Sequence, residues 1–360
     1  MGACASCQKA ASPQTPPVEH SERGQEHVAE AEFGFLGAKQ AGVGPWLWGV
    51  SLVQLTDLSP RHEWTMRDMV DKSITPTTRG TGLGYALKLN FQEPRVANIM
   101  VSHAWDELYS HFMNAIHCFV RKSMSEGAAW EANGYWVCAT AIYQAEDVPE
   151  LTIEKQLGPD PRCGPFAAVL RQASTMVACI TEACSIYSRM WCVFELFMAK
   201  ELAIPVFQAN GDEIHSGSVS TGSEFESPVV DAFGRQCLQP VNSKAARCGP
   251  PLVGGKPTPM NKDERMIREA IERSVGQFSA VDYSVEQARL ETLEHFLEEE
   301  RARHRDFSEA KKLLEKFWGI ERMEAFEQRF VKVFELYSEV IQAVKDRLDH
   351  LSKQLEMPST

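Results

Sequence analysis

The sequence predicts an α/β fold, in which a parallel sheet is covered by helices, followed by a charged helical region. Short apolar segments alternate with helix-like segments between residues 97 and 207, which is the pattern of repeated βαβ units. The expected strands are almost continuously apolar, as in sheets that are buried on both faces. Residues 261–360 hold 39 of the chain's 86 charged side chains, which marks them as a different kind of structure.

The elements of the expected α/β region follow in order along the chain. The strands are predicted at Ala97–Ser102, Tyr135–Tyr143, Thr175–Thr181 and Ile204–Phe207. The intervening helices are predicted at Leu108–Lys122, Phe166–Ala173 and Ser188–Leu202. Upstream, Arg61–Asp71 is expected to form a short helix, and the Thr, Pro and Gly residues of Ile74–Gly84 predict a loop.

The charged C-terminal region predicts several helices. They are expected at Lys262–Ser274, Ser284–Arg305 and Ser308–Phe317, with a last helix from Phe326 to Leu355. Apolar residues of this last helix recur at spacings of 4 and 3, which gives a seam of about four heptads. The seam predicts either a self-associating coiled coil or a helical hairpin within one chain. Its Phe and Tyr residues favour the hairpin, because coiled-coil dimers prefer aliphatic side chains.

Composition excludes several classes of protein. The net charge of −12 argues against a nucleic-acid-binding protein, which needs a basic surface. No apolar run is long enough for a transmembrane helix, and no secretory signal is present. Among ten cysteines, Cys4 and Cys7 form the only C-x-x-C pair, and no second pair completes a zinc site. We therefore expect reduced thiols, no bound metal and no resident cofactor.

The N-terminus predicts a lipid anchor. Gly2 and Ser6 fit the M-G-x-x-x-[ST] pattern of N-myristoylation. One myristoyl chain binds membranes only marginally, and the tail has just Lys9 and Arg23 against five glutamates. Palmitoylation of Cys4 and Cys7 is the remaining second signal. The prediction is a protein held on the cytoplasmic face of a membrane; the alternative is an unmodified tail in the cytoplasm.

Four regions are expected from these patterns. Residues 1–32 form a disordered, acylated tail, and residues 33–94 form an N-terminal extension. Residues 95–283 form the α/β domain, which contains a long loop rich in Gly, Ser, Asn and Pro at 208–260. Residues 284–360 form the C-terminal helical region.

Two segments of the α/β region resemble a known family. Ile99–Asp106 reads IMVSHAWD and is similar to the first box of TIR domains, the Toll/interleukin-1 receptor homology module. Ser188–Leu196 reads SRMWCVFEL and resembles the W-C-x-x-E-L helix of plant-type TIR domains. The resemblance covers roughly residues 95–210 and is closest to divergent TIR-like proteins of unicellular eukaryotes. The R-D-x-x-P-G signature of the BB loop is absent, and residues 144–165 take its place.

The resemblance implies a fold, a site and an activity. The implied fold is a flavodoxin-like, doubly wound sheet of order 2-1-3-4-5, which binds ligands beyond the carboxyl ends of its strands. Many TIR domains hydrolyse NAD with a glutamate that lies four residues after the motif's Trp, and Glu195 holds that position. NAD would then be the substrate. The implied substrate-binding residues are His103, Trp105, Asp106 and Trp191.

Each of these residues also has a purely structural interpretation. Glu195 lies on an apolar helix, where it can cap a neighbouring element or pair with Arg189 or Lys200. Trp105 can belong to the core, and His103 can bond to backbone at the end of its strand. The loop Arg79–Gly84 has the glycine content of a phosphate-binding loop without its spacing, which favours a simple turn.

Two functions follow for the whole chain. The first is a membrane-tethered, TIR-like signalling protein that hydrolyses NAD to nicotinamide and ADP-ribose products. The second is a non-catalytic TIR-like adaptor that recruits protein partners at a membrane. Self-association or binding to other proteins is expected in both cases.

Overall fold

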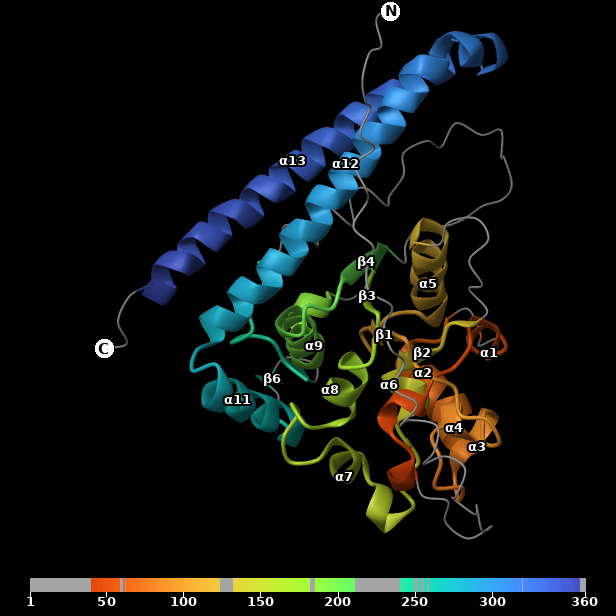
Figure 1. Ribbon diagram of the computed structural model, residues 1–360, viewed down its shortest axis with the longest axis vertical. Helices are drawn as coiled ribbons and strands as arrows, with labels where there is room; N and C mark the ends of the chain where they lie inside the picture. Colours follow the sequence, from red (N-terminus) through yellow and green to blue (C-terminus); the bar gives the residue numbers. More distant parts are fainter. Residues whose placement is uncertain are drawn as a thin grey trace, which may run out of the picture. The chain divides into compact units, whose positions relative to one another are not determined.

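The centre of the fold is a parallel sheet with strand order β2-β1-β3-β4 (Figure 1). Its strands are β1 (Ile99–Ser102), β2 (Tyr135–Val137), β3 (Thr175–Ile180) and β4 (Val206–Asn210). In the register, Ile99 of β1 is paired with Tyr135 of β2 and with Thr175 of β3. The α/β class is therefore confirmed, and the order matches the first four positions of the expected 2-1-3-4-5. No fifth strand joins this sheet within the residues that the structure describes.

The structure is a computed structural model. It describes residues 40–58, 61, 63–123, 132–181, 185–210, 240–248, 252–253, 256–257, 259–318 and 320–356. All of these residues belong to one unit, Lys39–Thr360. The predicted disordered tail at 1–32 and most of the long loop at 208–260 lie outside the described residues.

Apolar side chains alternate between the two faces of the sheet. Ile99 and Val101 of β1 belong to one buried cluster, whereas Met100 between them belongs to the other. In the same way, Tyr135 and Val137 of β2 share the first cluster, and Trp136 points to the second. Successive residues of a strand point to opposite faces, so an uninterrupted apolar run fills both cores.

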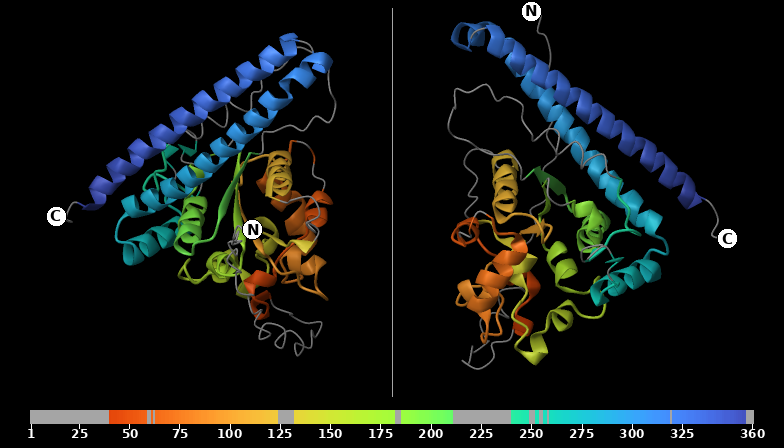
Figure 2. Two further views of the ribbon diagram at one scale, coloured as in Figure 1. Left: turned by 45° about the horizontal axis from the view of Figure 1, so that its top comes forward. Right: turned by 180° about the vertical axis from the view of Figure 1, so that it is seen from behind.

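Helices cover both faces. Figures 1 and 2 show α5 (Tyr109–Ser123) and α9 (Met190–Glu201) on opposite sides of the strands. Beside α5, the first cluster, which contains Ile99 and Val101, includes residues of α1 (Leu52–Thr56), α2 (Met66–Met69), a π-helical turn (Val70–Ile74) and α4 (Tyr85–Leu89). The short helix α3 spans Thr75–Thr78. The second core includes residues of α8 (Pro165–Leu170), α9, α11 (Lys262–Ser274), α12 (Phe278–Trp318) and α13 (Ile320–Glu356).

Shorter elements complete the fold. They are the helices α6 (Cys138–Ala141) and α7 (Ile153–Leu157), the 3-10 turns Gln40–Gly42, Pro45–Leu47, Pro149–Leu151 and Ile186–Ser188, and an antiparallel pair of β5 (Leu252–Val253) with β6 (Lys256–Pro257). None of the helices described in the structure is both long enough and apolar enough to cross a membrane.

The two long C-terminal helices lie side by side, and α12 also packs against α9 and β4 (Figures 1 and 2). From the seam of α13, Val340, Val344 and Leu351 are buried. The separate helices expected at Ser284–Arg305 and Ser308–Phe317 form one continuous helix, α12. No Gly or Pro interrupts its sequence, so nothing in the backbone chemistry breaks it.

Some sequence-based boundaries were wrong. The strand predicted at Tyr135–Tyr143 ends at Val137, because the chain turns into α6 at Cys138. The helix predicted from Arg61 begins only at Met66, where Thr65 caps it by accepting a hydrogen bond from the backbone of Asp68. Part of the loop predicted at residues 74–84 is helical, as α3.

Candidate functional site

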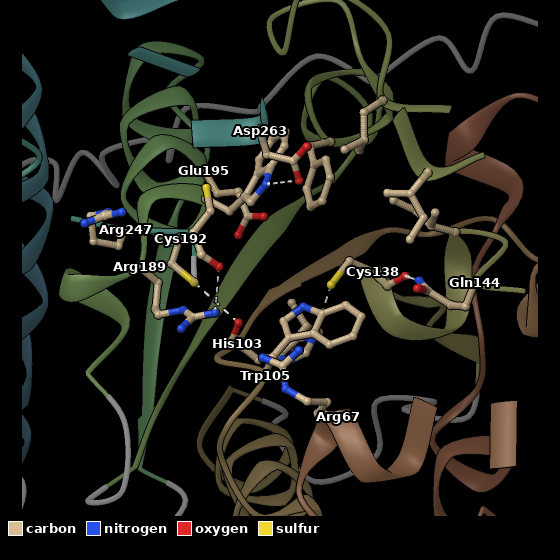
Figure 3. A pocket seen from close by; sticks show the side chains of 17 residues that line it. Arg67, His103, Trp105, Cys138, Gln144, Arg189, Cys192, Glu195, Arg247 and Asp263 are labelled. Atoms are coloured by element: carbon tan, nitrogen blue, oxygen red, sulfur yellow. Dashed lines mark hydrogen bonds between the residues drawn. The ribbon is translucent and has the colours of Figure 1, made fainter. Parts of the chain in front are cut away.

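A cavity of about 220 Å³ lies beside the carboxyl ends of β1 and β2 (Figure 3). Its polar and aromatic lining comes from Arg67, His103, Trp105, Gln144, Arg189, Trp191, Glu195, Arg247 and Asp263. Cysteines and apolar side chains complete it: Cys138, Cys192, Cys248, Val101, Ile142, Ile153, Leu157 and Phe166. Doubly wound sheets bind their ligands at this edge, so the cavity is the candidate functional site.

Four of the predicted site residues line this one cavity. His103 and Trp105 come from the segment that follows β1, and Trp191 and Glu195 come from α9. The fifth, Asp106, is not part of the lining; it lies next to the cavity and bonds to two of its arginines. The structure therefore brings two motifs that lie more than 80 residues apart to a single site.

Glu195 is the carboxylate buried most deeply in the wall of the cavity. Its helix α9 is apolar on nearly all sides because the sheet, α8, α11 and α12 surround it. Only 5% of Glu195 is exposed, and in Figure 3 its carboxylate is directed into the cavity. Burial raises the pKa of Glu195 to about 7, although the Ser102 hydroxyl and the positive charge of His103 act to lower it. This carboxyl therefore exchanges a proton near neutral pH.

The two structural partners considered for Glu195 are engaged elsewhere. Arg189 forms an ion pair with Asp106, with 3.2 Å between Nη1 and Oδ2. Lys200 forms an ion pair with Glu291 of α12. Neither cation neutralises Glu195, so its burial is not explained by a salt bridge to these residues. A buried carboxyl with a strongly raised pKa in a cavity is typical of functional sites.

Aromatic rings form the walls on either side of the carboxylate. The ring of Trp191 stacks on Phe166 with centroids 4.7 Å apart and an interplanar angle of 20°. Its Nε1 donates a hydrogen bond to Oδ2 of Asp263 at 3.4 Å. Burial raises the pKa of Asp263, and the Trp191 hydrogen bond partly opposes this. Trp191 is thus held in place from two sides as a flat wall of the cavity.

Trp105 also lines the cavity, and the guanidinium group of Arg67 lies over its ring. The guanidinium carbon of Arg67 is 5.7 Å from the ring centroid. Trp105 is only partly buried, and it packs at the margin of the first core cluster. The ring of Trp105 therefore supports the core and also lines the cavity, and its role in substrate binding stays a prediction.

Three arginines face the cavity, each held by a carboxylate. Asp106 accepts hydrogen bonds from Arg67 at 3.0 Å and from Arg189 at 3.2 Å. Arg247 forms a 2.8 Å ion pair with Glu264, which is buried at the start of α11. The cavity thus combines a buried acid with a margin at which Arg67 and Arg189 share the single carboxylate of Asp106, which leaves one positive charge over.

His103 is buried between two other reactive side chains. Its Nε2 lies 3.3 Å from Sγ of Cys138, and its Nδ1 lies 3.4 Å from Oε1 of Glu107. Nδ1 is also 3.4 Å from the backbone oxygen of Ala104, as expected for a histidine that bonds to backbone. Burial lowers the pKa of His103, but the charges of Cys138 and Glu107 and hydrogen bonds to both outweigh it, so the pKa lies well above its usual range.

Sequence reasoning missed several residues of the site. Three of them, Arg67, Arg247 and Asp263, lie outside both motifs, and no sequence pattern around them indicates a binding site. Cys138 was missed because the strand predicted at Tyr135–Tyr143 was expected to continue through it. Glu107 lies four residues after His103, a spacing that could have prompted a search for a paired acid.

The Gly-rich segment at residues 79–84 is a turn rather than a phosphate-binding loop. The backbone amide of Gly80 donates a 2.8 Å hydrogen bond to the carboxylate of Asp147. This carboxylate occupies the amide that a phosphate-binding loop would offer to a phosphate. Gly80 and Gly82 both have positive φ, at 75° and 66°, which explains the glycines by backbone conformation.

The predicted lipidation residues Gly2, Cys4 and Cys7 lie outside the described residues. Within the described part of the chain, no group of three or more His, Cys, Asp or Glu side chains is arranged to hold a metal ion. Comparisons with protein-family models, with curated proteins and with solved structures found no match for this chain.

Proposed function

We propose that this chain is a TIR-like signalling protein that hydrolyses NAD to nicotinamide and an ADP-ribose product. The observation that carries the proposal is Glu195: a buried carboxyl, directed into a cavity at the carboxyl ends of parallel strands, with a pKa of about 7. Glu195 also holds the position that the W-C-x-x-E-L resemblance assigns to the catalytic glutamate. Geometry and motif thus point independently to one residue.

The reaction needs only one carboxylate. The bond between C1′ of the ribose and the nicotinamide nitrogen breaks, and both bonding electrons leave with the nitrogen. Nicotinamide departs neutral because its ring was cationic in NAD, so no acid is required. Water then adds to C1′ and releases a proton. The carboxylate of Glu195 stabilises the positive charge that develops on the ribose, in a setting where little water screens it.

The volume of the cavity limits what enters it. At about 220 Å³, it is smaller than the roughly 300–1,000 Å³ of typical ligand pockets. We infer that the nicotinamide riboside half of NAD enters, with its ring against Trp105 or Trp191. The pyrophosphate stays at the margin, where Arg67 and Arg189 lie.

Membrane attachment is part of the same proposal. Myristoylation at Gly2 with palmitoylation at Cys4 and Cys7 would hold the chain on the cytoplasmic face of a membrane. The non-catalytic adaptor is the second candidate, and the pair of long helices favours it. α12 and α13 span 41 and 37 residues and offer a large surface to protein partners.

An assay of product release separates the two functions. The purified full chain is incubated with NAD, free and crowded on lipid vesicles, and nicotinamide is measured by chromatography. The matched pair of variants is Glu195→Gln and Glu201→Gln, both on α9, where Glu201 lies outside the cavity in an ion pair with Arg162. Release by the wild type and by Glu201→Gln, but not by Glu195→Gln, supports the enzyme. No release by the wild type in either condition refutes it and leaves the adaptor.

A further inference from the structure

The cavity contains a second reactive group, the thiol of Cys138, which has no role in the proposed NAD hydrolysis. β1 and β2 are neighbouring parallel strands in which Val101 is paired with Val137. His103 directly follows β1, and Cys138 directly follows β2. The register of the sheet therefore places the imidazole and the thiol at the same edge, although 35 residues separate them.

Cys138, His103 and Glu107 form a chain of contacts that ends in the cavity. Sγ of Cys138 lies 3.3 Å from Nε2 of His103, and Figure 3 shows this contact inside the cavity. On the other side of the ring, Nδ1 lies 3.4 Å from the buried carboxylate of Glu107. The ring of Phe112 packs edge-to-face on the imidazole, with centroids 5.3 Å apart, and limits its rotation. This is the order of nucleophile, base and orienting acid that activates a thiol.

The other two cysteines of the cavity lack this arrangement. Cys192 donates its thiol hydrogen to the backbone oxygen of His103 at 3.3 Å, and burial raises its pKa well above the usual range. Burial also raises the pKa of Cys248, to about 12. Both are held as neutral thiols at neutral pH. Of the three, only Cys138 has its sulfur against an imidazole nitrogen.

We propose that Cys138 is the nucleophile of an acyl-transfer site, in which His103 is the base and Glu107 positions the imidazole. The substrate class is activated esters, oxygen or thiol, of short apolar acyl groups. The apolar side chains Ile142, Ile153 and Leu157 line the same cavity and suit such a group. The limited volume of about 220 Å³ excludes long acyl chains. This activity is separate from NAD hydrolysis and does not rest on it.

The proposed step balances without any oxidant or reductant. With the thiol proton already held on Nε2 of His103, Sγ of Cys138 attacks the carbonyl carbon, and a C–S bond forms. The bond between that carbon and the leaving oxygen or sulfur breaks, and the leaving group takes the proton from His103. A water molecule, deprotonated by His103, then attacks the thioester. The products are a carboxylic acid, an alcohol or thiol, and the regenerated Cys138.

The test uses the full chain and p-nitrophenyl butyrate. We expect a rapid release of p-nitrophenol that approaches one equivalent, with the butyryl group mapped to Cys138 by peptide mass spectrometry. Cys138→Ser should abolish this release, and His103→Gln should slow it by about 100-fold. Cys163→Ser is the matched control: it removes an exposed thiol that does not line the cavity and should leave the release unchanged.

A second measurement needs no variant. Wild-type protein is labelled with limiting iodoacetamide, and the labelling rates of Cys138 and Cys163 are compared within one sample. The proposal predicts faster labelling at Cys138, although Cys163 is the more exposed. It is overturned if Cys163 reacts faster, if the butyryl group maps to another cysteine, or if no butyryl-protein forms.

Discussion

Asp106 joins Arg67 and Arg189 across the margin of the cavity, and its pair with Arg189 brings the two motifs of the sequence together. Oδ2 of Asp106 lies 3.2 Å from Nη1 of Arg189, and Oδ1 lies 3.0 Å from Nη2 of Arg67. Asp106 follows β1, whereas Arg189 is the N-cap residue of α9, the helix that carries Glu195. The pair keeps Arg189 away from Glu195 and holds its charge at the cavity margin.

Arg189→Gln should weaken the binding of NAD more than it slows the chemistry. The variant removes a cation from the place where we put the pyrophosphate, so KM should rise about tenfold, equivalent to about 1.4 kcal/mol. The value of kcat should change little because Glu195 is untouched. Steady-state kinetics check this, with Arg162→Gln as a control, since Arg162 pairs with Glu201 outside the cavity. An unchanged KM for Arg189→Gln would place the pyrophosphate elsewhere.

Glu195→Gln should stabilise the protein at alkaline pH. The pKa of Glu195 is raised from 4.5 to about 7 in the folded state, so the folded chain resists losing this proton. The resulting stability is present in full below pH 4.5 and is lost as the pH rises through 7. At pH 8 the loss amounts to about 3 kcal/mol, and a neutral amide avoids it.

Urea unfolding at pH 5 and at pH 8 measures this difference. The variant and the wild type should unfold with similar free energies at pH 5, and the variant should be the more stable at pH 8. Equal stability of wild type and Glu195→Gln at pH 8 would mean that Glu195 is not held in a desolvated position.

The sequence predicted the sheet better than it predicted the site. Continuous apolar runs mark strands that are buried on both faces, so β1, β3 and β4 were located to within a few residues. The end of β2 was missed because Cys138–Ala141 is as apolar as the strand before it, and periodicity cannot separate a short strand from a short helix.

Residues that line the cavity were predictable from the sequence where they lie within one of the two motifs. Glu195 and Trp191 share the W-C-x-x-E-L segment, and His103 and Trp105 share the segment after β1. The contact between Cys138 and His103 depends on the register of two strands, which no local pattern records. Asp263 depends on the packing of α11 beside α9, which likewise has no signal in the sequence.

The apolar seam of α13 should stabilise a single chain rather than a dimer. Val344 is 3% exposed and belongs to the same buried cluster as residues of α12 and α9. Val344→Ala should therefore lower the free energy of unfolding by about 2 kcal/mol, independently of protein concentration. Val331→Ala is the control on the same helix: Val331 is 52% exposed, so its loss should cost less than about 0.5 kcal/mol.

Light scattering on the full chain completes this test. A monomer agrees with a hairpin of α12 and α13 within one chain. A dimer whose stability rises with concentration and falls in Val331→Ala would instead favour the coiled coil, because the exposed side of α13 would then form the contact.

Membrane attachment should require both lipid signals. Gly2→Ala removes the myristoylation site and should move the protein from the membrane to the soluble fraction of eukaryotic cells. Cys4→Ser with Cys7→Ser should leave only weak, reversible binding, because one myristoyl chain gives an association constant of about 10⁴ M⁻¹. Cys163→Ser controls for loss of a cysteine. Membrane binding that persists in Gly2→Ala would refute the anchor.

The rate of nicotinamide release at pH 8 by wild type and by Glu195→Gln tests the central claim most directly. Removing a group that stabilises charge in a transition state lowers the rate by about 100- to 1,000-fold. We predict a loss of that size for Glu195→Gln, with the rate of Glu201→Gln equal to that of the wild type. Equal rates for wild type and Glu195→Gln would contradict the role given to Glu195.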